Sequence, residues 1–319
     1  MKTHIRLAAI FVLIICVFAL CSCSGGAETE QKTPVPEKTA APEEEIEGSL
    51  PPSPVLSPSQ EPEPEIIEAA WSEYFNGFNG AAVLYDPSGM RYTVFNSDLA
   101  QTRRSPCSTF KIISSLIALE NGILVPEDST REWSGEIFWN EKWNRDIDFT
   151  DAFHESCVWY FRELTDDVGQ EIVQEELNKL QYGNCDISDW EGRLNTNNSN
   201  RALTGFWIES SLLISPKEQT EVMERIFKES SPYLEETRES LKQVMLVADR
   251  DTSGINIYGK TGMGKRDGIT VDAWFTGFAE KAEENVYFCI YLGKTDSMNV
   301  SSAAAKEIAI RLVSDYFDN

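Results

Sequence analysis

Two short clusters of Ser, Thr and Lys residues could carry out covalent chemistry. Ser108 and Lys111 form the only Ser-x-x-Lys sequence in the chain. On a helix, positions i and i+3 share a face, so the amine of Lys111 would lie against the Ser108 hydroxyl and could activate it as a nucleophile. A helix that begins at Ser108 would also favour the oxyanion formed in acyl transfer. The alternative is a helix-capping serine with a solvated lysine.

The second cluster, Lys260-Thr261-Gly262, follows an apolar stretch, and we expect it at the end of a strand, just before a turn. A lysine there supplies positive potential and a threonine supplies a hydroxyl. A glycine has no Cβ and lets a ligand lie against the strand. Together they suit an anionic ligand, and the alternative is an ordinary strand end with a solvent-facing lysine.

The elements that would position these clusters follow from the hydrophobic pattern. Residues rich in β-branched and aromatic types predict strands at 80–86, 91–96, 255–258, 272–280 and 286–292. Apolar residues at helical spacing predict helices at 108–120, 166–181, 216–229 and from 299 onward. The expected fold is of the α+β type, with one antiparallel sheet from both chain ends, flanked by helices, and a mostly helical middle.

Composition excludes several classes of protein. The chain has 319 residues, 52 acidic against 28 basic, and a net charge of −24. Nucleic-acid binders need a basic surface, and attraction to anionic lipid headgroups needs one as well, so neither kind of partner is expected. Only two histidines are present, so a His-rich metal site is not expected either. Nothing in the pattern indicates an oligomer, and a monomer is expected.

The first 22 residues have the pattern of an export signal. Two basic residues precede the apolar run Leu7 to Leu20, which is too short to span a bilayer comfortably. The run ends in Leu20-Cys21-Ser22-Cys23, similar to the lipobox of bacterial lipoproteins, with Cys23 as the lipidated residue. We expect an exported lipoprotein anchored on the outer side of the cell membrane. Plain secretion is the alternative.

Residues 23–65 are expected to form a disordered tether, because they are rich in Pro and Glu and have almost no large apolar side chains. The folded domain is then 66–319, long enough for one sizeable core. It contains four cysteines whose spacing shows no disulfide framework, and we expect buried free thiols: Cys107, Cys157, Cys185 and Cys289.

Taken in order, six motifs of the folded part resemble those of class D serine β-lactamases, the oxacillinase type of penicillin-recognising serine enzyme. The motifs are Ser108-Thr109-Phe110-Lys111, Ser156-Cys157-Val158, Tyr182-Gly183-Asn184, Phe206-Trp207-Ile208-Glu209, Lys260-Thr261-Gly262 and Trp274-Phe275-Thr276-Gly277. The resemblance covers about 70–319 and implies a β-lactamase/transpeptidase-like fold, a β-lactam ligand and hydrolysis of that ligand.

Val158 distinguishes this chain within the superfamily. Penicillin-binding transpeptidases usually carry Asn at this place, and class A enzymes do too. An apolar wall desolvates Lys111 and lowers its pKa, because burial disfavours a charged amine. The resemblance then implies a carboxylated lysine (N6-carboxylysine) at Lys111, so that carbon dioxide or bicarbonate is the only cofactor requirement.

The resemblance also implies roles in acylation. Ser108 Oγ attacks the lactam carbonyl, with carboxylated Lys111 as the general base. The backbone N–H groups of Ser108 and Met263 form the oxyanion hole. Ser156, between Lys111 and Lys260, passes a proton to the lactam nitrogen.

Further roles implied by the resemblance concern the substrate and the water. Thr261 and Gly262, with the preceding lysine, bind the substrate carboxylate. Trp207 donates its indole N–H to the carbamate. Val158 and Ile208 gate the water that releases the acyl group. Tyr182, Asn184 and Glu209 are expected to be structural, and His154 to be a surface or loop residue.

One family feature has no counterpart here. Many class D enzymes bind the carboxylate with an arginine beyond the Trp-x-x-Gly strand, where this chain has no arginine before Arg311. Lys265 or Arg266 could compensate, or Thr261 could act alone. The alternatives to a β-lactamase are a β-lactam sensor that acylates and stalls, a D,D-peptidase and a non-enzymatic lipoprotein.

Overall fold

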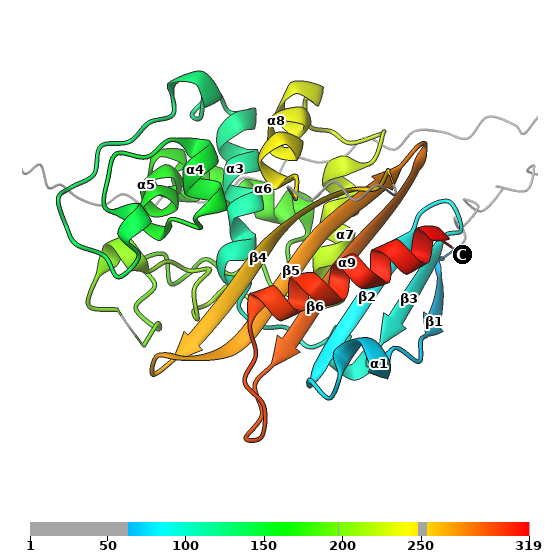
Figure 1. The fold of residues 1–319 in the computed structure, drawn as a ribbon. Helices are drawn as coiled ribbons and strands as arrows, with labels where there is room; N and C mark the ends of the chain where they lie inside the picture. The colour runs from blue at the N-terminus through cyan, green and yellow to red at the C-terminus, as the bar shows by residue number, and fades with distance from the viewer. Residues whose placement is uncertain (1–62, 197, 248–253, 319) are drawn as a thin grey trace, which may run out of the picture. The chain divides into compact units, whose positions relative to one another are not determined.

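One six-stranded sheet organises the molecule (Figure 1). The computed structural model describes residues 63–196, 198–247 and 254–318, all within one unit of the chain, Gln60–Asn319. The signal at 1–22, the lipidation site Cys23 and the tether up to residue 62 lie outside the described residues. The strand order is β1-β3-β2-β6-β5-β4. The strands are β1 (Glu65–Glu68), β2 (Gly80–Asp86), β3 (Arg91–Phe95), β4 (Asn256–Arg266), β5 (Ile269–Lys281) and β6 (Glu284–Gly293).

Strands from the two ends of the chain meet in the middle of this sheet. β2 pairs antiparallel with β3 on one side and with β6 on the other, and β5 pairs antiparallel with both β6 and β4. The expected antiparallel sheet is confirmed. Its one parallel pair is β1 with β3. β1 was not predicted, and it begins at Glu65, inside the expected tether.

Helices cover both faces of the sheet. They are α1 (Ser72–Phe75), α2 (Ser97–Ala100), α3 (Lys111–Glu120), α4 (Phe149–His154), α5 (Val158–Val168), α6 (Gln170–Leu180), α7 (Pro216–Phe227), α8 (Glu235–Met245) and α9 (Ser302–Asp318). In Figure 1, α9 crosses one face, where Ile308 and Leu312 share a core with Phe288 and Ile290 of β6. The helical middle, α3 to α8, lies on the other side. No helix among the described residues is long and apolar enough to cross a membrane.

Local signals in the sequence explain where two of these helices begin or end. α7 begins with a capping box, in which Ser215 and Glu218 satisfy each other's backbone N–H groups, and Pro216 occupies the first turn. The predicted helix at 166–181 is divided between α5 and α6. Gly169 separates them with a φ of 84°, a conformation that glycine adopts readily and that ends a helix.

The expected place of Lys260-Thr261-Gly262 at a strand end is wrong. The three residues lie in the middle of β4, which continues to Arg266. They pair with Thr276, Phe275 and Trp274 of β5. Gly and Lys are poor strand formers, so the sequence signal ended at Tyr258, but the long β5 supplies a pairing partner for the whole segment.

Candidate active site

Ser108 lies on a tight turn that leads directly into α3. A 3₁₀ helix, Cys107–Phe110, precedes α3, so Lys111 is the first residue of the α-helix. Lys111 Nζ donates a hydrogen bond of 3.1 Å to Ser108 Oγ, as the i, i+3 spacing predicted. Cys107, just before the serine, has a φ of 50°, which is unusual for a residue with a side chain. Such strain occurs where the surrounding structure fixes a reactive group.

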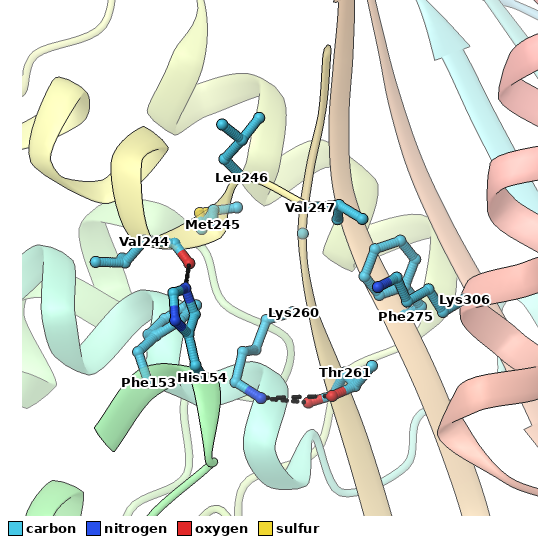
Figure 2. Close-up of a pocket in the computed structure, with 11 residues that line it drawn as sticks. Phe153, His154, Val244, Met245, Leu246, Val247, Lys260, Thr261, Phe275 and Lys306 are labelled. Atoms are coloured by element: carbon cyan, nitrogen blue, oxygen red, sulfur yellow. Dashed lines mark hydrogen bonds between the residues drawn. The ribbon is translucent and has the colours of Figure 1, made fainter. Parts of the chain in front are cut away.

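The second serine and the second lysine meet across the site. Ser156 lies between α4 and α5, also with a positive φ, of 56°. Lys260 Nζ on β4 donates a 3.1 Å hydrogen bond to Ser156 Oγ, although the two residues are 104 positions apart. The same amine donates to the carbonyl oxygen of Thr261 at 3.2 Å (Figure 2). The structure therefore forms two Lys–Ser pairs from four predicted residues.

Both amines are kept away from water, and their pKa values fall. Burial lowers the pKa of Lys111 to about 8, because the charged ammonium loses hydration. Burial and the nearby charge of Lys111 lower the pKa of Lys260 well below its ordinary value. The aromatic rings of Phe161 and Phe153 lie 5.2 Å and 5.6 Å from these two amines, respectively. Above about pH 8, Lys111 is thus a neutral amine in contact with a serine, as a general base must be.

Gly262 permits a close approach between β4 and the serine turn. A Cβ at this position would lie 2.9 Å from the Pro106 carbonyl oxygen and 2.9 Å from Thr109 Cγ2, too close for either. Any side chain would therefore push the strand away from Ser108. The next residue, Met263, is 37% exposed. That the backbone N–H groups of Met263 and Ser108 form an oxyanion hole stays a prediction.

Trp207 packs against the serine turn and presents a free donor. Its carbonyl oxygen accepts hydrogen bonds of 2.9 Å from the Cys107 N–H and from Ser105 Oγ. Its ring stacks on Phe110 at 5.6 Å between centroids, above Gly205, where any Cβ would collide with the indole. The indole Nε1 is buried and has no hydrogen-bond partner among the described residues. A buried donor without a partner is costly, so an acceptor bound next to this nitrogen would be stabilised.

The remaining predicted residues fall into two groups. Val158 and Ile208 are half-buried and pack against the hydrophobic core that contains Trp207. Asn184 is structural, as expected, because its side chain donates to the Ser211 carbonyl at 2.8 Å and accepts from the Leu213 N–H at 2.9 Å.

Two further expectations concern Glu209 and the thiols. The Glu209 carboxylate accepts a hydrogen bond from the backbone N–H of Lys265, which ties the Trp207 loop to β4, a structural role as expected. All four cysteines of the described part are free, as expected, but only Cys107, Cys157 and Cys289 are buried, whereas Cys185 is half-buried.

Arg162 is a site residue that the sequence analysis missed. It lies on α5, is 2% exposed, and its guanidinium lies over the rings of Trp190 at 5.0 Å and Trp207 at 5.3 Å. It donates to the Trp190 carbonyl oxygen at 2.8 Å and pairs with Asp166, which also binds Arg201. The signal available in the sequence was an arginine within the mostly apolar segment 158–164, which also contains Glu163. Arg162 connects the helix that follows Ser156 to the Trp207 indole.

A cavity of about 260 Å³ lies beside Lys260 (Figure 2). It is bounded by the ends of α4 and α8, by the two residues after α8, by β4 and β5, and by α9. His154 lines it and is exposed, as expected, with Nε2 3.0 Å from the Val244 carbonyl oxygen. The lining residues are Phe153, His154, Val244, Met245, Leu246, Val247, Gly259, Lys260, Thr261, Phe275 and Lys306.

The sheet with its flanking helices and the two Lys–Ser pairs match a penicillin-binding serine acyl-transferase fold, and comparison with known proteins agrees. The family model described as the penicillin binding protein transpeptidase domain matches residues 78–314. The chain belongs to this family, whose fold binds β-lactams. Its sheet and flanking helices are those of the β-lactamase/transpeptidase fold.

Individual relatives are of two kinds. The chain is 32% identical to the probable β-lactamase YbxI of Bacillus subtilis over 76% of this chain and 82% of that protein. It is 29% identical to the regulatory protein BlaR1 of Bacillus licheniformis, over 76% of this chain but only 38% of the regulator.

Solved structures divide in the same way. The C-terminal domain of the Bacillus licheniformis BlaR penicillin receptor has a TM-score of 0.68 at 27% identity, covering 80% of this chain and 98% of that domain. A class D β-lactamase from Bacillus subtilis has a TM-score of 0.66 at 30% identity, covering 78% and 95%.

Proposed function

We propose that the protein is a class D serine β-lactamase that hydrolyses β-lactam antibiotics through an acyl-serine intermediate on Ser108. The observation that carries this proposal is the buried, unpartnered indole N–H of Trp207 beside the Ser108–Lys111 turn. A neutral lysine and a dry donor together suit a carbamate, because the donor satisfies the anion formed when the amine takes up carbon dioxide. Carboxylation of Lys111 would supply the general base for acylation and for deacylation.

The chain's own residues provide the other steps of acylation. Ser108 Oγ loses its proton on the Lys111 side, where the two groups are in contact, and attacks the lactam carbonyl carbon. The developing oxyanion is assigned to the N–H groups of Ser108 and Met263. As the C–N bond breaks, Ser156, which is hydrogen-bonded to Lys260, delivers a proton to the lactam nitrogen and regains the proton that the Lys111 side took from Ser108. Water then releases the acyl group from Ser108.

The second candidate function is that of a β-lactam sensor, which is acylated but does not turn over. The similarity to BlaR1 and to its receptor domain favours this candidate. Both functions share the acylation chemistry, so deacylation is the step that separates them.

The experiment that tests the proposal is rapid mixing of the full chain with a chromogenic cephalosporin, with and without added bicarbonate. We expect sustained turnover that rises with bicarbonate and is lost in Ser108→Ala and Lys111→Ala. Lys228→Ala, on the far end of α7, is the matched lysine control and should behave like the wild type. A single stoichiometric burst followed by a stall, even with bicarbonate, would assign the protein to the sensors.

Carboxylation itself has a readout that does not depend on turnover. With ¹³C-bicarbonate, the wild-type protein should show one carbamate carbon resonance that is absent from Lys111→Ala. Its absence from the wild type at saturating bicarbonate and about pH 9, where the amine is neutral, would remove the carbamate from the proposal.

A further inference from the structure

The cavity beside Lys260 has a second lysine that no catalytic step uses. Lys260 and Thr261 line it from β4, and Lys306 lines it from α9, on the other side of the outer strand (Figure 2). The cavity therefore joins the last helix of the chain to two residues of the candidate active site. A volume of about 260 Å³ is enough for part of a small ligand but not for a large one.

The cavity differs in charge from the rest of the molecule. None of its lining residues is Asp or Glu, in a chain with a net charge of −24. Its other walls are largely apolar, from Phe153, Phe275 and the segment 244–247. Apolar walls strengthen the attraction of lysines for an anion, because they keep water away from the charges. The cavity thus suits a ligand with one anionic group and an apolar remainder.

The other two cations considered for an anionic ligand are placed differently. The ammonium of Lys265 lies over the ring of Trp139 at 5.0 Å, and the backbone N–H of Lys265 donates to the Glu209 carboxylate. Arg266 is the exposed last residue of β4, beyond a register shift between Gly264 and Lys265. Neither lines the cavity. Lys306, in contrast, lines the same cavity as Thr261.

We propose that Lys306 binds the carboxylate of the acylating ligand together with Thr261 and Lys260, in the position of charge partner that an arginine fills in many class D enzymes. The identity of the ligand as a carboxylate-bearing β-lactam rests on the proposed function. Thr261 offers a hydroxyl, and Lys306 offers an ammonium on a flexible stem that reaches from α9. An anion in this cavity would also favour the protonated form of Lys260, which burial otherwise disfavours.

The test compares a penicillin with its methyl ester, which lacks the negative charge. Acyl-enzyme formation on the full chain is followed by mass spectrometry over a range of ligand concentrations. In Lys306→Met we expect the half-saturating concentration of the free acid to rise about tenfold, with the limiting acylation rate unchanged. With the ester, the variant and the wild type should agree. Lys306→Arg should restore most of the loss, and Lys265→Met and Arg266→Met are the matched cation controls.

The outcomes separate this inference from the proposed function. A wild-type protein that acylates, with Lys306→Met equal to it on the free acid, would overturn the role of Lys306 alone. Equal losses on acid and ester would also overturn it, because they would indicate a structural effect. A tenfold loss in Lys265→Met instead would move the role to that residue. A wild-type protein that is acylated by neither compound would overturn the proposed function and, with it, the carboxylate ligand.

Discussion

At the scale of single residues, the site contains two Lys–Ser pairs, each joined by a hydrogen bond, and burial keeps both amines away from water. Two ammonium groups this close repel each other, and burial penalises each charge, so the pair holds fewer protons than two free lysines would. One neutral amine is then present without any carboxylate base. Among the described residues, the chemistry is thus set by desolvation rather than by an acid–base pair of opposite charge.

The first prediction concerns pH. The pKa of Lys111 is lowered to about 8, so its neutral fraction grows as the pH rises through that value. Carbamate formation needs the neutral amine. At a constant concentration of dissolved carbon dioxide, turnover should therefore increase from about pH 6.5 to about pH 9. Steady-state rates with the carbon dioxide concentration held fixed provide the measurement, and a rate that falls over this range would contradict it.

The second prediction concerns the indole donor. Trp207→Phe keeps a ring against Phe110 but removes Nε1, so a carbamate would lose a charged hydrogen bond. The bicarbonate concentration for half-maximal turnover should rise about tenfold, with acylation affected less than deacylation. Trp190→Phe makes the same exchange at the other indole that contacts Arg162 and is the control. An unchanged bicarbonate requirement in Trp207→Phe would show that the indole holds no carbamate.

The motifs predicted which residues react, but not how they are held. Ser108 and Lys111 are close in sequence, so helix geometry alone predicted their contact. The contact between Ser156 and Lys260 joins distant segments, and only motif order indicated it. Arg162 could not be assigned, because one arginine on an apolar helix face looks the same in sequence whether it reaches solvent or lies between two indoles.

At the scale of elements, the distance between β4 and the serine turn is the critical dimension. Gly262→Ala would place a methyl group 2.9 Å from the Pro106 carbonyl oxygen, and the strand would have to move. A displacement of about 1 Å between reacting groups lowers rates about 100-fold, so the acylation rate should fall by roughly this factor.

The control for this prediction lies on β6. In Gly293→Ala, the added methyl group meets only the side chains of Tyr291 and Asn79, at 3.0 Å or more, so these can adjust. Acylation followed by mass spectrometry measures both variants. Equal rates in Gly262→Ala and the wild type would mean that the strand tolerates a wider separation.

The elements differ in how far the sequence could predict them. The hairpin of β2 and β3 has β-branched strands and a Pro-Ser-Gly turn, and it was predicted within one residue. β1 has only four residues, all exposed, so no alternating pattern marks it, and pairing with β3 is what makes it a strand. β4 was predicted too short for a similar reason, since its second half depends on β5.

At the scale of the whole molecule, the next prediction concerns where the N-terminal segment places the protein. We expect Cys23 to carry a lipid, which would hold the domain outside the cell membrane. Radiolabelled fatty acid should enter the wild-type protein and Cys21→Ala, but not Cys23→Ala. Equal labelling of all three proteins, or none in the wild type, would instead support plain secretion.

The sheet topology also sets the order in which the site can mature. Ser108 follows the first three strands of the chain, β1 to β3, whereas Lys260 lies on β4, one of the last three. The two groups of strands join where Gly80 of β2 pairs with Leu292 of β6. Closing so long a loop is slow, because its entropy is lost before the contacts form. A chain still being synthesised, or cut before β6, lacks this junction, so β4 and its Lys260 are not joined to the sheet of β2 and β3. Such a chain should not react with β-lactams, so acylation reports that the whole domain has finished folding.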